Sequence, residues 1–175
     1  MRVTTKEAVV ERRHREATVV LPASPSKVFG FVDDHARFSS HMGQSSWMMA
    51  GSRMAVELDA AEGRAVGAHI RMSGRILGVR LFLDEVITRR QVPTTKVWST
   101  VGTPRLLVIG AYTMGVEIAA DGDKSRLRVF IDFDLPSGVA SYWLGALFGG
   151  IYAAWCVKQM TIGAAEHFWT ARSVA

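Results

Sequence analysis

Cysteine is nearly absent from this sequence, and its scarcity excludes several classes of protein. The only cysteine, Cys156, lies between Trp155 and Val157 in an apolar stretch. One cysteine cannot form a disulfide framework, and such usage is typical of a reducing compartment, so we expect a cytoplasmic protein. The apolar neighbours predict a buried thiol, whereas a nucleophilic cysteine needs a partly exposed, electropositive site.

The short motifs of several enzyme and nucleic-acid-binding classes are also missing. The sequence contains no nucleophile elbow, phosphate-binding loop, dinucleotide-binding fingerprint or zinc-spaced set of cysteines and histidines. It has no helix-turn-helix spacing, paired aromatic RNA-binding motif or zinc module, and we therefore expect no nucleic-acid partner. The N-terminal residues lack the apolar core and the cleavage site of a signal peptide.

Charge of either sign is absent from one long stretch. Residues 139–157 run for nineteen positions without a charged side chain, and Gly145 and Gly149 form a GxxxG motif. That length is enough to span a bilayer, and GxxxG is a close-packing motif of membrane helices. A buried helix in a globular domain has the same composition, so the neighbouring sequence has to decide between the two.

Positive charge is in modest excess over the whole chain. The net charge is +5, mostly from arginines that are scattered singly, with one dense cluster at Arg12, Arg13 and Arg15. Scattered arginines are typical of a solvated basic surface. With 175 residues, 49% of them hydrophobic, the chain is long and apolar enough for one globular domain.

Apolar and polar residues alternate with a period of two through the middle of the chain. Such alternation is typical of antiparallel strands with one dry and one wet face. Asp121-Gly122-Asp123 is a strong hairpin signal between the last two segments. The alternating segments are 54–58, 68–76, 106–118 and 127–135, with less regular ones at 79–89 and 94–101.

Two short helices are predicted before this series of strands. A strand at 15–21 is followed by Ser24, a good helix N-cap, and by Pro25, which is tolerated at the first helical position. These residues predict a helix that ends near Asp33. A second short helix is expected over 35–41.

A long helix is predicted after the strands, from the apolar stretch to about Arg172. Its second half is amphipathic, which is unusual for the continuation of a membrane span. A sheet with one dry face needs a cover, so we interpret residues 15–172 as a single α+β domain preceded by a tail at 1–14. We expect Gly145, Gly149 and Gly150 to let the helix bend or approach the sheet closely.

In this order of elements the sequence resembles the START-related SRPBCC superfamily, which includes polyketide cyclase/dehydrase-like proteins. The resemblance implies a helix-grip fold, in which a curved antiparallel sheet of about six or seven strands wraps around a long C-terminal helix. An apolar cavity would lie between sheet and helix, and the two short helices would close one end. The segments that carry the resemblance are EATVVLPASPSKVFGFVDD, VGAHIRMSGRILGVRLFLDEVI, TKVWSTVG and YWLGALFGGIYAAWCVKQM.

A set of inward-facing residues is the candidate ligand site. Methionine adapts to irregular apolar shapes, and tyrosine or tryptophan adds one polar group. His41, expected at the cavity mouth, is a further candidate that would donate to a ligand oxygen. The expected cavity lining is Met72, Trp98, Tyr112, Met114, Phe133, Tyr152 and Met160, together with His41.

The sequence gives only a weak signal for a metal site. His35 and His41 lie near Asp33 and Asp34, but two histidines six residues apart on one helix do not share a face. We therefore expect neither a metal nor another cofactor.

The signal for catalytic acidic residues is also weak. Glu57, Asp132 and Asp134 fall opposite the apolar faces of their strands, so we expect them in solvent. Asp84 and Glu85 are adjacent, so one of them must point inward or lie at a bulge. We expect that residue to pair with an arginine rather than to act in catalysis.

The sequence thus predicts a protein that binds, and in doing so carries or sequesters, a small apolar molecule such as a lipid, quinone or polyketide. One alternative is a polyketide cyclase or dehydratase, which would need an inward-facing titratable residue. Another is a membrane-associated lipid or quinone carrier that contacts the bilayer without spanning it. The sequence leaves the oligomeric state open.

Overall fold

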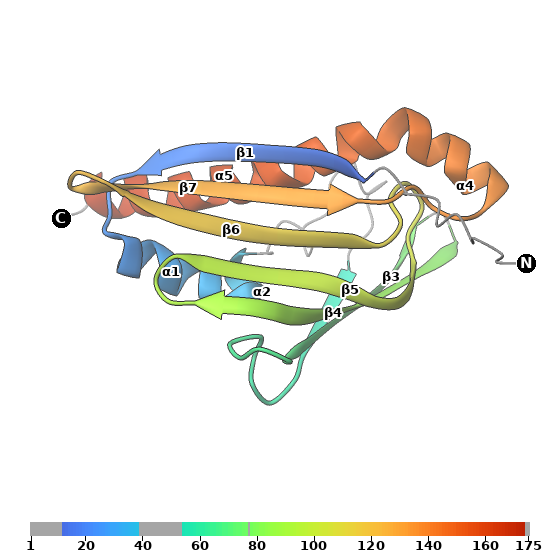
Figure 1. Ribbon diagram of the computed structural model, residues 1–175, viewed down its shortest axis with the longest axis horizontal. Helices are drawn as coiled ribbons and strands as arrows, with labels where there is room; N and C mark the ends of the chain where they lie inside the picture. The colour runs from blue at the N-terminus through green and yellow to red at the C-terminus, as the bar shows by residue number, and fades with distance from the viewer. Residues whose placement is uncertain (1–11, 39–53, 77, 174–175) are drawn as a thin grey trace, which may run out of the picture.

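One seven-stranded antiparallel sheet and one long helical segment make up most of the protein (Figure 1). The structure, a computed structural model, describes residues 12–38, 54–76 and 78–173. This arrangement is the helix-grip fold that the resemblance implies. The elements are β1 (Arg13–Leu21), α1 (Pro25–Asp33), α2 (His35–Phe38), β2 (Met54–Leu58), β3 (His69–Ile76), β4 (Val79–Gln91), β5 (Thr95–Arg105), β6 (Tyr112–Asp121), β7 (Lys124–Phe133), α4 (Val139–Leu144), η2 (Gly145–Gly149) and α5 (Gly150–Ser173).

The strands follow one another across the sheet in the order β1-β7-β6-β5-β4-β3-β2. Every neighbouring pair is antiparallel, and β1 crosses over to pair with β7 along its whole length. The predicted hairpin is confirmed, because Asp121 pairs with Lys124 and Gly122 adopts a φ of 62° between β6 and β7. β1 begins at Arg13, two residues earlier than the sequence predicts.

The core lies on the face of the sheet that the helix covers. In β7, Leu127, Val129, Ile131 and Phe133 are all buried, as their alternation predicts. The same alternation on β6 begins only at Tyr112. The prediction of a single strand over 106–118 is wrong for its first part, because β5 runs on to Arg105 and residues 106–111 form a loop before β6. Within that loop the Gly110 amide donates to the carbonyl of Asp134 at 2.8 Å, so the loop is held by the chain that leaves β7.

Close backbone approach fixes where the long helix crosses the end of the sheet. The helix is continuous from α4 into α5, with one turn of π-helix between them. A Cβ added to Gly149 would lie 2.6 Å from the carbonyl oxygen of Val108, and one added to Gly145 would lie 3.0 Å from the same atom. The expected close approach is confirmed for Gly145 and Gly149, although the backbone that they meet is the loop at 106–111, whereas a Cβ on Gly150 would meet the Arg15 side chain of β1. The π-turn provides the irregularity that such crossings use.

Only the second half of the apolar stretch is gripped by the sheet. Ala153, Cys156 and Val157 are buried, whereas Trp143 and Leu147 expose 65% and 66% of their surface. The prediction that the whole of 139–157 covers the sheet is therefore wrong for its first half. The reason is geometric, since α4 extends past the ends of β1 and β7 (Figure 1).

The helix from Val139 to Thr170 is long and apolar enough to cross a membrane, judged by length and composition alone. In this fold the second half of the helix packs against the sheet. Met160 and Ala164 continue the buried side of α5 beyond Val157, and α5 packs along β1 and β7. That second half is therefore the core helix of the domain.

A buried ionic cluster ties the end of α1 to the sheet. Lys96 on β5 is fully buried, and its Nζ donates to the backbone oxygen of Asp33 at 2.9 Å and lies 3.2 Å from Asp33 Oδ1. Arg90 on β4 donates to both carboxylate oxygens of Asp33, at 3.1 and 2.7 Å. Burial alone would raise the pKa of Asp33, but these two cations hold that pKa below its ordinary value.

Two glycines on the helix provide a matched test of the close approach. We expect Gly149→Ala to lower the free energy of unfolding by about 1–3 kcal/mol, because the new methyl group meets a backbone oxygen that cannot move aside. Gly163→Ala, where a Cβ would meet nothing within 4 Å, should instead raise it by about 0.5–1 kcal/mol. Denaturant unfolding of both variants measures the difference, and equal effects would contradict the packing described.

Candidate functional site

A small cavity of about 40 Å³ lies between the covered face of the sheet and α5. Side chains from α2, from β3 to β7, from the 106–111 loop and from α5 surround it. Most of these side chains are apolar. The lining is His35, Met72, Leu83, Glu85, Trp98, Leu106, Ile109, Tyr112, Met114, Ile131, Tyr152, Cys156 and Met160.

Most of the residues predicted from the sequence meet around this cavity. Six of them line it: Met72, Trp98, Tyr112, Met114, Tyr152 and Met160. Phe133 is fully buried but does not line the cavity, because it packs beneath the helix crossing, where a Cβ on Gly149 would lie 3.4 Å from its ring. His41 lies outside the described residues. That these side chains contact a ligand remains a prediction.

Glu85 is the unexpected member of the site. Its side chain is almost fully buried on β4, and Tyr112 donates its hydroxyl proton to Glu85 Oε1. His35 Nε2 lies 3.7 Å from Glu85 Oε2, and the imidazole meets the Trp98 ring edge-on at 5.2 Å between centroids. A carboxyl, a phenol and an imidazole therefore meet beside an indole within an apolar enclosure.

The neighbouring acid faces the other way. Asp84 accepts a hydrogen bond from His69 at 2.9 Å and lies 3.5 Å from Arg71, on the wetter face of the sheet. Asp84 thus has an arginine nearby, but Glu85 is the residue that points inward. For Glu85 the expectation of an arginine partner is wrong: strand alternation places its side chain among Leu83 and Ile87, and its partner there is Tyr112.

Burial dominates the electrostatics of this site. It raises the pKa of Glu85 to about 7, against the opposing effect of the Tyr112 hydroxyl and the Trp98 indole. Near neutral pH the carboxyl is thus divided between its protonated and ionised forms. Burial also raises the pKa of Tyr112 well above its ordinary value, so the phenol stays protonated as a donor.

Cys156 contributes volume rather than reactivity. Burial raises the pKa of its thiol to about 12, with a hydrogen bond from Tyr152 opposing the shift. Since the thiolate is the nucleophile, this cysteine is inert at neutral pH. The buried position predicted from its neighbours is confirmed, and the residue also forms part of the cavity wall.

Within residues 12–38, 54–76 and 78–173, no three side chains of histidine, cysteine, aspartate or glutamate converge as metal ligands would. His35 and Asp33, which are close in sequence, belong to different groups. His35 faces Glu85, whereas Asp33 is bound by Arg90 and Lys96.

Two polar members of the site were missed by sequence reasoning, although one left a signal. Leu81, Leu83, Glu85 and Ile87 occupy alternate positions in β4, so the alternation itself places Glu85 on the dry face. His35 left no comparable signal, because only the packing of α2 against the sheet brings it to Glu85.

The sequence matches the model of a family described as polyketide cyclase / dehydrase and lipid transport, over residues 12–162. No curated protein sequence matches the chain.

Several solved structures share the fold at low sequence identity. TTHA0849 from Thermus thermophilus is 13% identical with a TM-score of 0.64, and the match covers 91% of this chain and 99% of that one. Norcoclaurine synthase from Thalictrum flavum is 11% identical with a TM-score of 0.61, covering 89% and 92%. Mll3558 from Rhizobium loti is 17% identical with a TM-score of 0.60, covering 87% and 96%. At these identities the likeness shows the fold alone.

The raised pKa of Glu85 makes stability depend on pH. The folded protein holds this proton more tightly than the unfolded chain, so the stabilisation present below pH 4.5 is lost as the pH rises through 7. Glu85→Gln keeps a neutral group that can accept from Tyr112. We expect this variant to match the parent near pH 4 and to be about 3 kcal/mol more stable at pH 8–9.

Denaturant unfolding at a series of pH values measures this difference. Asp121→Asn is the matched control, because it removes an exposed carboxylate together with its ion pair to Arg126 and does not act on the pKa of Glu85. It should not stabilise the protein at pH 8. A constant difference between Glu85→Gln and the parent at every pH would show that Glu85 does not titrate as described.

Proposed function

Because the chain belongs to the polyketide cyclase/dehydrase and lipid transport family, we propose that it binds a small apolar ligand in the cavity beneath α5. The observation that carries this proposal is the cavity itself, which is walled by apolar side chains and contains one buried carboxyl group. Such an arrangement is typical of small-molecule sites, where apolar walls supply affinity and few polar groups fix the orientation.

The size of the cavity limits the ligand. At about 40 Å³ it is well below the volume of roughly 300–1,000 Å³ found around drug-sized ligands. Met72, Met114 and Met160 line it from three different elements, and unbranched methionine side chains can rearrange around an entering molecule. We therefore favour a ligand of one or two rings, or a short chain, over a long lipid.

The carboxyl group sets the expected chemistry of the ligand. Tyr112 already donates to Glu85 Oε1, which leaves Glu85 Oε2 as an acceptor with no hydrogen bond among the described residues. An ionised Glu85 would accept a hydrogen bond from a ligand hydroxyl, and a protonated Glu85 would donate to a carbonyl. The ligand should therefore carry a single hydroxyl or carbonyl group on an apolar body.

Naphthalene and 2-naphthol test this proposal as a matched pair of probes. We expect both to bind, and 2-naphthol to bind more tightly at pH 8. Glu85→Leu should lower the affinity for 2-naphthol about tenfold or more, because the hydrogen bond is lost, and should leave the affinity for naphthalene almost unchanged. Isothermal titration calorimetry measures both, with Asp121→Asn as the control. Binding of neither probe to the parent protein would reject the cavity as a ligand site.

Acid–base catalysis on the bound molecule is the second candidate function, and Glu85 favours it. A carboxyl with a pKa near 7 inside an apolar cavity is well placed for proton transfer at neutral pH. In a dehydration, ionised Glu85 would take the proton from the carbon next to a ligand carbonyl. The same proton would then leave with the β-hydroxyl as water, which restores the carboxylate and forms the carbon–carbon double bond.

The β-hydroxy ketone 4-hydroxy-4-phenylbutan-2-one tests this second candidate, since its dehydration product absorbs in the near ultraviolet. We expect the rate to rise with pH through about 7 as Glu85 ionises. Glu85→Gln should lower the rate by about 10²–10⁴-fold. Equal rates for the parent and this variant would exclude catalysis by Glu85, while the binding proposal would still be judged by the naphthol pair.

A further inference from the structure

One end of the molecule exposes an apolar helical face. The exposed side chains of α4, η2 and the first turn of α5 form what we call the α4 face. Together they present aliphatic and aromatic groups with no charge among them. The α4 face consists of Val139, Tyr142, Trp143, Leu144, Leu147, Phe148 and Ile151, each between 44% and 83% exposed.

Basic residues gather at the same end of the sheet. Arg75 on β3 pairs directly with Arg80 on β4, and Arg105 on β5 lies opposite Phe82. We call these three arginines the arginine cluster. Across residues 12–38, 54–76 and 78–173, none of the three forms an ion pair with a carboxylate. Like charges directly opposite one another are destabilising, so the pairing of Arg75 with Arg80 works against the fold unless an anion lies nearby.

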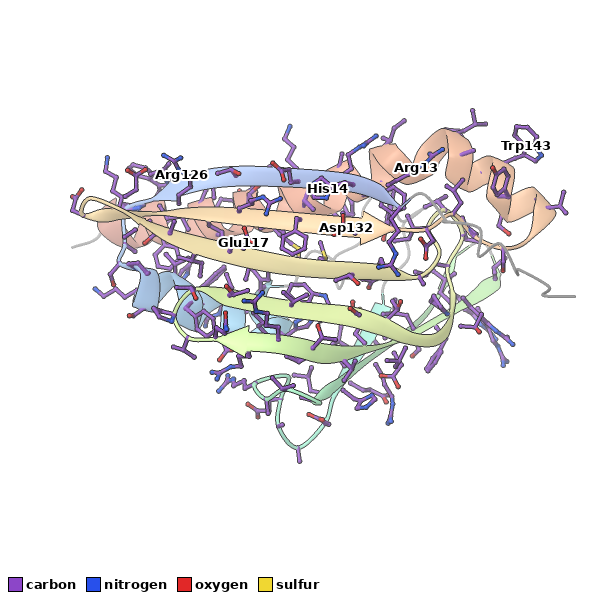
Figure 2. All side chains as sticks on the ribbon, in the orientation of Figure 1. Arg13, His14, Glu117, Arg126, Asp132 and Trp143 are labelled. Carbon is purple, nitrogen blue, oxygen red and sulfur yellow. The ribbon has the colours of Figure 1, made fainter. Side chains whose placement is uncertain are left out.

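The two features lie at the same end of the sheet (Figure 1). Arg105 borders a shallow depression with Arg75, Arg80 and the exposed Phe82. Its chain neighbours Pro104 and Leu106 border a second depression, which is also lined by residues 134–138 and by Ser141 of α4. Arg13 also reaches this end and donates to the carbonyl of Ala146 at 3.2 Å (Figure 2). Figure 2 shows Arg13 and Trp143 at the same end, with Arg126 at the other.

We propose that this end docks on the surface of a bilayer that contains anionic phospholipid. The α4 face would enter the boundary between headgroups and acyl chains, where tryptophan and tyrosine are favoured. The arginine cluster would meet the lipid phosphates, and each arginine near an anionic surface contributes about 1 kcal/mol. Docking is a property separate from the proposed ligand binding and does not depend on it.

Charge argues for a membrane over a second copy of the chain. A twofold interface sets the same patch against itself, so two copies would bring arginine clusters together. Asp134, an acid that borders the second depression, already lies 3.4 Å from Arg12. An anionic lipid surface supplies the opposite charge that a second copy lacks.

Vesicle co-sedimentation tests the proposal with the full chain. We expect binding to vesicles of phosphatidylcholine and phosphatidylglycerol at 3:1, weaker binding at high salt, and least binding to phosphatidylcholine alone. Trp143→Ser/Leu147→Ser should lower the partition coefficient at least tenfold. Arg75→Ser/Arg80→Ser should lower it about thirtyfold on the anionic vesicles.

Matched controls lie away from this end. Val92→Ser removes a side chain that is 60% exposed, and Arg126→Ser removes an exposed arginine of β7. Neither should change vesicle binding, and thermal denaturation checks that all variants fold. Quenching by lipids with brominated acyl chains gives a second readout, and Trp143→Phe should abolish most of that quenching.

Three outcomes would overturn the proposal. One is failure of the parent protein to sediment with anionic vesicles. Another is that Val92→Ser or Arg126→Ser lowers binding as much as the other variants do. The third is a stable dimer, seen by sedimentation velocity, that Trp143→Ser/Leu147→Ser converts to a monomer without any vesicle binding. That last result would assign the α4 face to a second copy.

Discussion

The contact between the helix backbone at Gly145 and Gly149 and the carbonyl of Val108 is the constraint on which the rest of the structure depends. It sets where the long helix crosses the end of the sheet. From that crossing onward, one side of α5 lies over the dry face and brings Tyr152, Cys156 and Met160 to the cavity. Before the crossing the same helix has no sheet beneath it, and its apolar side chains stay in solvent. The buried wall of the site and the exposed α4 face are thus two consequences of one close approach.

The carboxyl group in the cavity lowers stability at neutral pH. A leucine at position 85 would complete the alternation of β4 and would need no hydrogen bond. Glu85 instead brings a carboxyl into an apolar enclosure, where burial opposes its ionisation. Buried titratable groups of this kind are concentrated at functional sites, and this supports the proposal that the cavity binds a ligand. The Asp33, Arg90 and Lys96 cluster differs, because its carboxylate is paired with two cations that connect the end of α1 to β4 and β5.

Sequence patterns predicted the fold well where a single face decides the residue type. Alternation in β7 marked its buried side chains correctly, and Asp121-Gly122-Asp123 marked its hairpin. The same reasoning failed at Leu106 and Val108, which continue the alternation of β6 but lie in a loop. The local pattern could not show that the Gly110 amide donates a hydrogen bond to the carbonyl of Asp134, which holds this segment as a loop outside the sheet. Six predicted lining residues do meet at the cavity. Glu85 was missed although the alternation of β4 places it on the dry face, and His35 was missed because only the packing of α2 brings it there.

By itself the sequence determined the order of elements, the dry face of the sheet and the apolar character of the C-terminal helix. These properties follow from residue periodicity and turn chemistry, which act over a few positions. Only the tertiary structure decided how far the sheet reaches along the helix, and hence which apolar residues are core and which are surface. It also decided the partner of Glu85, since Tyr112 and His35 reach that carboxyl from distant strands and helices. Burial and ionisation depend on contacts between distant segments, and no local pattern encodes them.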